Sequence, residues 1–193
     1  MTESIQNTEA QSLWQCLHDG NVISLESDFL ARTLTIAVNS PYHWEFHKLP
    51  AETSFRIVGE NVRIAEVFAF EPRLGAEEPP RETQWEEAQS KRLSDYEKGR
   101  LISTDWNAFV ADVETDEDYE IMNAELTNGR SPEVLELGIM SYPNSNYRTV
   151  RIHAERFRFH VGERELPLQD FREFGEAYWK HFAQRPKAGS TET

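Results

Sequence analysis

Strand-length runs of alternating apolar and polar residues recur along this chain, and they constrain its fold more than any other feature. The runs cover residues 22–25, 34–38, 55–57, 62–70, 119–126, 134–142 and 147–161. Segment 27–32 separates the first two runs, and the alternation on either side of it predicts an antiparallel hairpin. The turn sequence Gly59-Glu60-Asn61 predicts a second hairpin between the next two.

The longest run changes the parity of its apolar positions. They are even-numbered up to Ala154 and odd-numbered from Phe157. Because successive side chains of a strand point to opposite faces, a bulge or turn is expected near Ala154. The runs together predict an α+β fold whose sheet is a largely antiparallel meander of about 6–8 strands.

Three helices are expected to pack on this sheet. The C-terminal helix follows Pro167, and its apolar residues recur every three or four positions on one aromatic face: Leu168, Phe171, Phe174, Tyr178 and Phe182. A middle helix is predicted after Asp105, which can cap it, with apolar residues at Trp106, Phe109, Val110 and Val113. A short N-terminal helix, with Thr8 as its candidate cap, ends at His18-Asp19-Gly20.

The length of 193 residues predicts a single domain over 1–193. Residues 71–104 are rich in Pro and Glu, so we expect an acidic, exposed excursion there, and a flexible tail at 186–193. The single cysteine, Cys16, excludes an internal disulfide and a Cys-based zinc site. No apolar run approaches the roughly 20 residues that span a bilayer. Residues 1–10 have no secretory pattern, so a cytoplasmic protein without a membrane segment is predicted.

Charge is distributed unevenly. The chain has 20 basic and 34 acidic residues, a net charge of −14. Residues 71–136 hold 18 acidic and 7 basic side chains, a net of −11, whereas 143–193 hold 9 basic and 7 acidic. A negative surface repels nucleic acid and attracts basic partners, so we expect a protein partner or self-association and no nucleic acid. The alternative interpretation is that acidity only keeps the protein soluble.

Two groups of residues are candidate sites. In an extended strand, His43, Glu45 and His47 point to one face and can hold a metal ion. The same spacing is expected of an ordinary amphipathic strand. The second group is a basic stripe that can bind an anion or pair with carboxylates across the sheet: Arg151, His153, Arg156, Arg158 and His160.

Other features indicate structure rather than chemistry. His18-Asp19 lacks the further helical ligands that metal-dependent phosphohydrolases need, and with Gly20 it suits a helix stop. Cys16 lies beside apolar residues and is interpreted as a buried structural thiol. Gly-rich phosphate loops, Gly-x-Ser-x-Gly and His-Glu-x-x-His are absent, and no cofactor is predicted.

The string LHDGNVISLESDFLARTLTIAV, residues 17–38, resembles the opening of small bacterial α+β families, some linked to toxin immunity. These families begin with a helix, a His-Asp-Gly or His-Asp-Ala turn and a hairpin. The resemblance implies a non-enzymatic role in protein binding or regulation and carries over no functional residue. The alternative hypothesis is a small-molecule or metal-binding enzyme that uses the His43, Glu45 and His47 face.

Overall fold

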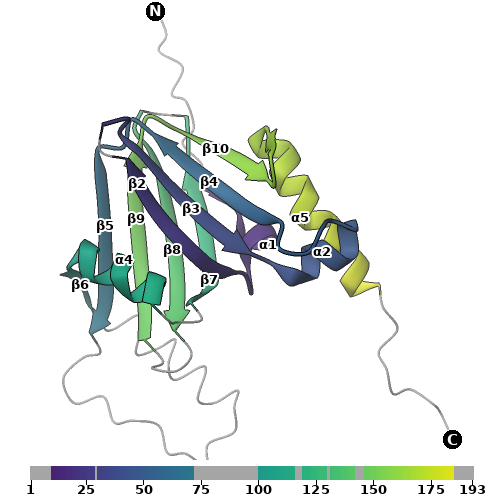
Figure 1. Ribbon diagram of the computed structural model, residues 1–193, viewed down its shortest axis with the longest axis horizontal. Coiled ribbons are helices and arrows are strands. Elements are labelled where there is room, and N and C mark those ends of the chain that lie inside the picture. Colours follow the sequence, from purple (N-terminus) through teal and green to yellow (C-terminus); the bar gives the residue numbers. More distant parts are fainter. Residues whose placement is uncertain are drawn as a thin grey trace, which may run out of the picture.

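The computed structural model describes residues 10–28, 30–71, 100–115, 119–129, 131–141 and 146–184. These residues form one antiparallel sheet of eleven strands and four helices (Figure 1). The strands are β1 (Ala10–Ser12), β2 (Asn21–Asp28), β3 (Thr33–Asn39), β4 (Ser54–Glu60), β5 (Ile64–Glu71), β6 (Arg100–Thr104), β7 (Tyr119–Thr127), β8 (Glu133–Ser141), β9 (Asn146–Ala154), β10 (Arg156–Val161) and β11 (Arg164–Leu166). The helices are α1 (Trp14–Leu17), α2 (Pro41–His47), α4 (Trp106–Thr115) and α5 (Leu168–Ala183). The α+β antiparallel prediction is confirmed, but the strands outnumber the expected 6–8.

The sheet consists of two halves. Its strand order is β11-β10-β4-β3-β2-β7-β8-β9-β5-β6, with β1 paired to β7. Among the described residues, β2 and β7 share a single register pair, Asn21 with Glu120, whereas their other neighbours pair over most of their length. The five strands from β11 to β2 therefore form one half, and those from β7 to β6 form the other.

The two halves face each other across a common core. The chain crosses between them at Glu155, whose amide N–H donates to the Glu60 carbonyl at 2.9 Å. The Arg63 N–H donates to the His153 carbonyl at 2.8 Å and adds a second link. The largest wholly buried side chains come from both halves and from the helices: Phe55, Phe171, Leu13, Leu17, Ile36, Ile57, Ile121, Leu126, Leu135, Leu137, Ile139 and Ile152.

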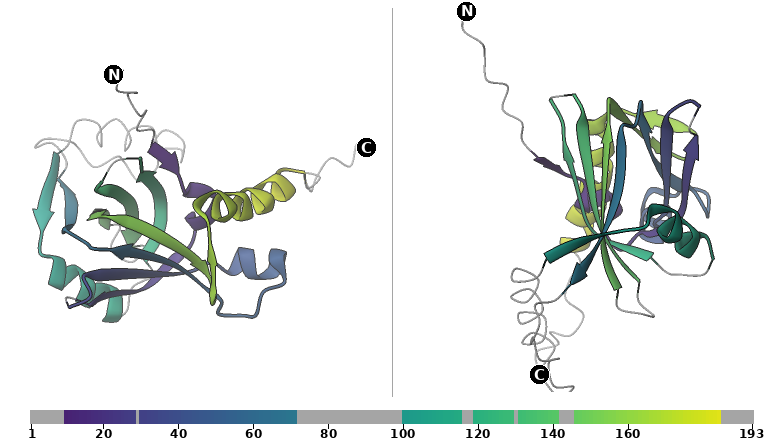
Figure 2. Two further views of the ribbon diagram at one scale, coloured as in Figure 1. Left: turned by 90° about the horizontal axis from the view of Figure 1, so that it is seen from above. Right: turned by 90° about the vertical axis from the view of Figure 1, so that its left-hand side faces the viewer.

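Helices close this core on opposite sides. Helix α4 contacts both β2 and β5, so it bridges the two halves (Figure 2). Helix α5 contacts β10, β11, α1 and α2 on the other side of the molecule (Figure 1). Phe171 of α5 is wholly buried against Phe55 and Phe159. Burial of each such side chain contributes roughly 2 kcal/mol to stability.

The elements with strong local signals occur where the sequence predicts them. The β2–β3 hairpin, the α5 helix and the division of the last run at Glu155 are confirmed. Helix α4 is also confirmed, and Asp105 caps it by accepting a 2.8 Å hydrogen bond from the Ala108 N–H.

Other expectations were wrong or lie outside the described residues. Strands β4 and β5 do not pair with each other: β4 lies between β3 and β10, and β5 between β9 and β6. The N-terminal helix is one turn, preceded by β1. Of the excursion expected at 71–104, residue 71 and residues 100–104 are strand and the rest is outside the described residues, as are Thr8 and the tail at 186–193. In the described chain, no helix is long and apolar enough to cross a membrane.

Helices α1 and α5 approach each other closely at Gly175. A Cβ atom at this position would lie 2.5 Å from the Cys16 Sγ, 2.6 Å from the Gln15 carbonyl oxygen and 2.7 Å from the Cys16 backbone nitrogen. Two of these atoms belong to the backbone, so they cannot move without shifting α1. Glycine is thus required for the observed packing of the two helices.

Gly175→Ala is expected to lower the free energy of unfolding by about 1–3 kcal/mol, because the added methyl group forces α1 away from α5. Alanine has a higher helix propensity than glycine by about 1 kcal/mol. Without the contact to α1, the substitution would therefore stabilise the helix. Urea unfolding measures the effect, with Ala177→Gly on the exposed face of α5 as the propensity control. An unfolding midpoint for Gly175→Ala at or above that of the wild type would contradict the contact.

Candidate functional site

Residues 41–47 form helix α2, and this corrects the strand expected for the metal candidate. Ser40 occupies the N-cap position, Pro41 begins the helix and Lys48 ends it in a left-handed conformation. In a helix, residues four apart share a face, so His43 and His47 come together. Glu45 is exposed, away from the buried His43. The three proposed ligands therefore do not converge.

The two imidazoles pack among aromatic rings. His43 is 2 % exposed and contacts Phe55, Phe174 and Tyr178. The His47 Nε2 lies 3.0 Å from the Phe174 carbonyl oxygen, and its ring stacks on the Phe174 ring with centroids 3.6 Å apart. In the described part of the chain, no group of three or more His, Cys, Asp or Glu side chains is arranged to hold a metal ion.

Burial makes His43 a weak base. Desolvation, with a smaller contribution from neighbouring His47, lowers the pKa of His43 to about 4, and a hydrogen bond to the Gln15 backbone acts in the opposite direction. Desolvation also lowers the pKa of His47. Both rings are therefore neutral at pH 7 and serve as part of the packing between α2 and α5.

The predicted basic stripe is divided between the two halves of the sheet. Arg151 and His153 lie on β9, whereas Arg156, Arg158 and His160 lie on β10. The arginines pair with carboxylates: Arg151 with Glu136 at 2.6 Å, Arg156 with Glu60, and Arg158 with Glu60 at 2.7 Å and Glu165 at 3.1 Å. The His160 Nε2 is 3.9 Å from the Glu165 carboxylate, and the His153 carbonyl accepts the Arg63 N–H. This geometry favours the cross-strand pairing alternative.

His18 and Asp19 form a close polar pair next to α5. The His18 Nδ1 lies 2.7 Å from the Asp19 Oδ1. The His18 ring contacts Trp14 and Trp179, with centroids 4.3 Å and 5.8 Å away. The Cys16 thiol donates a 2.8 Å hydrogen bond to the Phe171 carbonyl, and burial raises its pKa to about 12. Cys16 therefore stays a protonated structural thiol at neutral pH.

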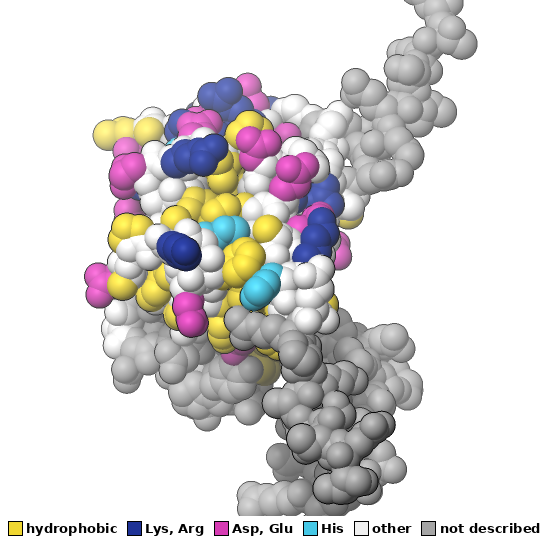
Figure 3. Space-filling view, turned by 90° about the vertical axis from the view of Figure 1, so that its right-hand side faces the viewer, with side chains coloured by type: hydrophobic (Ala, Val, Ile, Leu, Met, Phe, Trp, Pro, Cys, Tyr) yellow, Lys and Arg dark blue, Asp and Glu magenta, His cyan; other side chains and the backbone are white. Residues whose placement is uncertain are grey.

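Aromatic side chains also reach the surface where α2 meets the end of α5. Tyr42, Phe46, Tyr178, Trp179 and Phe182, named here the aromatic surface, form a chain of ring contacts with centroids 5.1–6.2 Å apart. Tyr42 is 42 % exposed and Phe182 is 49 % exposed. Figure 3 shows hydrophobic and histidine side chains gathered on this side of the molecule.

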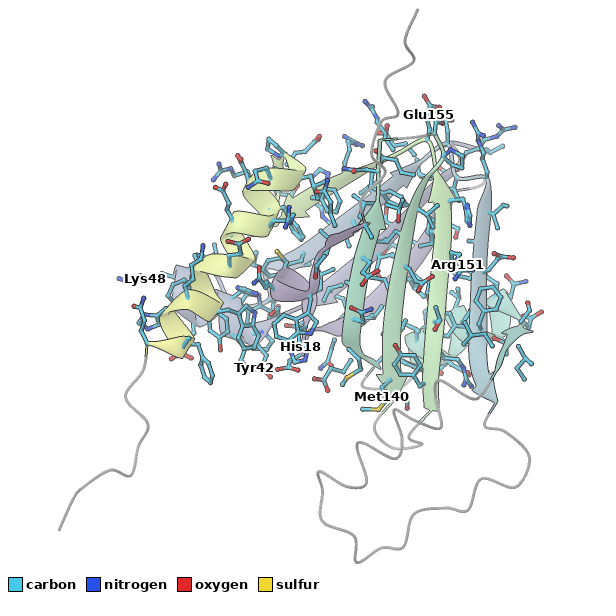
Figure 4. The ribbon with its side chains drawn as sticks, turned by 180° about the vertical axis from the view of Figure 1, so that it is seen from behind. His18, Tyr42, Lys48, Met140, Arg151 and Glu155 are labelled. Atoms are coloured by element: carbon cyan, nitrogen blue, oxygen red, sulfur yellow. The ribbon has the colours of Figure 1, made fainter. Side chains whose placement is uncertain are left out.

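Carboxylates flank the aromatic surface on one side. Figure 4 shows His18 beside Tyr42, below α1. Desolvation raises the pKa of Tyr42, and the negative charges of Asp19 and Glu120 raise it further. The Asp19 and Glu120 carboxylates therefore lie close enough to Tyr42 to act on its hydroxyl. Aromatic rings next to carboxylates suit a cationic side chain, which gains from both the ring faces and the charges.

The sequence alone does not mark Tyr42, Phe46 or Trp179 as binding residues. The sequence feature that could have indicated these residues is the high number of aromatic side chains on α5 and in segment 42–46. The two segments are more than 120 residues apart, and no sequence window contains both. Comparisons of the chain with protein-family models, with curated proteins and with solved structures find no match.

Stability is expected to fall as the pH is lowered from about 6.5 to about 4, because the unfolded chain protonates His43 before the folded chain does. The shift corresponds to a loss of about 3 kcal/mol below pH 4. Urea unfolding between pH 7 and pH 4 measures this loss for the wild type and for His43→Phe, which should lack this component of the pH dependence. The exposed His181→Gln variant is the control and should follow the wild type. Parallel curves for His43→Phe and the wild type would contradict the assignment.

Proposed function

We propose that this chain is a non-enzymatic, protein-binding or regulatory protein that docks a basic partner protein on its aromatic surface. The proposal rests on the exposure of Tyr42 and Phe182, which lie at the edge of the aromatic surface. Large exposed apolar patches on soluble proteins mark interaction sites. Tyrosine and tryptophan are also the residues most enriched at the energetic centres of protein interfaces.

The surface is already organised for binding. Tyr178 is 9 % exposed and contacts Tyr42, Phe46 and Phe182, so the outer rings rest on a fixed support. The Trp179 indole N–H donates a 2.9 Å hydrogen bond to the Gln15 carbonyl, which fixes its ring between α1 and α5. Rings held in place lose little conformational entropy on binding, and this favours affinity.

Electrostatics supports a basic partner. The chain has a net charge of −14, and Asp19 and Glu120 lower the potential near Tyr42. Complementary charge steers association and excludes acidic competitors. A basic toxin or nuclease held inactive by an acidic inhibitor is one arrangement of this kind, and it agrees with the immunity-like role that segment 17–38 implies.

Site-specific photo-cross-linking tests the proposal. A photoreactive phenylalanine analogue at Phe182 is expected to capture one basic protein in cells that make this chain naturally. The same analogue at Leu30, which is 99 % exposed in the β2–β3 turn, is the matched control and should not capture it. Mass spectrometry identifies the captured protein. An acidic partner, or equal capture at both positions, would count against the proposal.

Tyr42→Ala with Phe182→Ala is expected to weaken binding of the captured protein at least about 100-fold, because each truncated hot-spot side chain costs about 2 kcal/mol or more. Binding should also weaken as salt rises. Isothermal titration measures both effects. The unfolding midpoint of the variant should stay near that of the wild type, since both side chains are substantially exposed. If the double variant binds the captured protein with unchanged affinity, the aromatic surface is not part of the interface.

A further inference from the structure

A cavity of about 440 Å³ lies on the side of the molecule that α4 closes. Its lining comes from the ends of β2 and β3 with their turn, the start of β5 with the residues before it, and the first turn of α4. The cavity therefore lies between the two halves of the sheet, where α4 bridges them (Figure 2). Its volume is within the range of about 300–1,000 Å³ typical of small-molecule sites.

The cavity wall is partly apolar. Leu34 is buried, and Val62, Ala65 and Trp106 are half-buried around it. The Trp106 ring packs on Phe109 of the same helix, with centroids 6.0 Å apart, which fixes its position at the wall. An apolar wall with an aromatic ring suits the hydrocarbon body of a ligand.

Two arginines, Arg32 and Arg63, complete the lining. Neither side chain has a carboxylate partner among the described residues. They differ in this from four other described arginines that pair with glutamates, Arg56, Arg151, Arg156 and Arg158. Unpaired guanidinium groups beside an apolar cavity are available to an external anion.

One carboxylate, that of Asp28, also lines the cavity. Its Oδ1 accepts 2.9 Å hydrogen bonds from the backbone N–H groups of Leu30 and Ala31. These bonds hold the carboxylate on the β2–β3 turn and compensate its charge. The cavity lining contains two arginines and one aspartate, so its formal charge is positive.

We propose that this cavity binds a small organic carboxylate with an apolar body. The carboxylate pairs with Arg32 and Arg63, whose planar donor pairs match its two oxygens. The body lies against Leu34 and Trp106. This site is separate from the aromatic surface and does not depend on the proposed function.

Three matched probes test the proposal: 4-phenylbutyrate, its neutral amide and the corresponding amine. Each is titrated into the full chain labelled with ¹⁵N, and the Trp106 indole and Asn107 amide signals report on the cavity. The carboxylate is expected to shift these signals and to bind at least about tenfold more tightly than the amide, with the amine weaker still. Equal affinity for the three probes, or shifts confined to residues outside the cavity, would overturn the proposal.

Arginine variants test whether Arg32 and Arg63 bind the carboxylate of the probe. Arg63→Gln and Arg32→Asn are each expected to weaken 4-phenylbutyrate binding about tenfold. Asn is chosen at position 32 because the backbone there has φ = 53°, which Asn tolerates. Arg164→Gln changes an exposed arginine of β11 outside the cavity, so it is the control and should bind as the wild type does. Thermal unfolding checks that each variant is folded, and wild-type affinity in both cavity variants would refute the proposal.

Discussion

The two halves of the sheet share one core, but in the described residues their strands pair directly only at Asn21–Glu120 of β2 and β7. Isolated backbone hydrogen bonds, such as Glu155 to Glu60 and Arg63 to His153, add further links. Such an arrangement leaves the core open on the sides where the halves do not pair. Apolar side chains there must be covered by other elements, because their exposure to water would cost roughly 2 kcal/mol each. Helices α4 and α5 supply the cover on opposite sides. The cavity lies where α4 meets the sheet, and the aromatic surface lies where α5 meets α2.

Local signals predicted the covering elements but not the pairing of the halves. The aromatic spacing of α5 and the Asp105 cap of α4 act within a few residues, so the sequence displays them directly. The Gly59-Glu60-Asn61 sequence does form a turn, with Asn61 at φ = 50°. That turn sends the chain into the other half of the sheet, so β4 pairs with β3 and β10 while β5 pairs with β9 and β6. Which strands pair depends on contacts between residues far apart in the sequence, and a short stretch of sequence does not contain them.

The strand expected over 42–47 was wrong for a different reason. Alternation of aromatic and polar residues over 42–47 indicates a strand, yet Ser40-Pro41 is a recognised start of a helix. In the structure the helix start prevails, and His43 and His47 become packing residues. The aromatic surface and the arginine-lined cavity each combine segments that are distant in sequence. The sequence shows which residues are present, but only the fold shows that they lie together.

Strand β3 connects the two regions physically. Its first residues, Thr33 and Leu34, line the cavity, and its last leads through Ser40 into α2, which carries Tyr42. The strand is hydrogen-bonded along its length to β2 and β4, and Leu34, Ile36 and Val38 are at most 3 % exposed. Energetic coupling between sites requires an element with two discrete arrangements that both ligands bias. A strand paired on both edges and buried by its side chains is a rigid connection between the cavity and the aromatic surface, so neither of the two proposals needs the other.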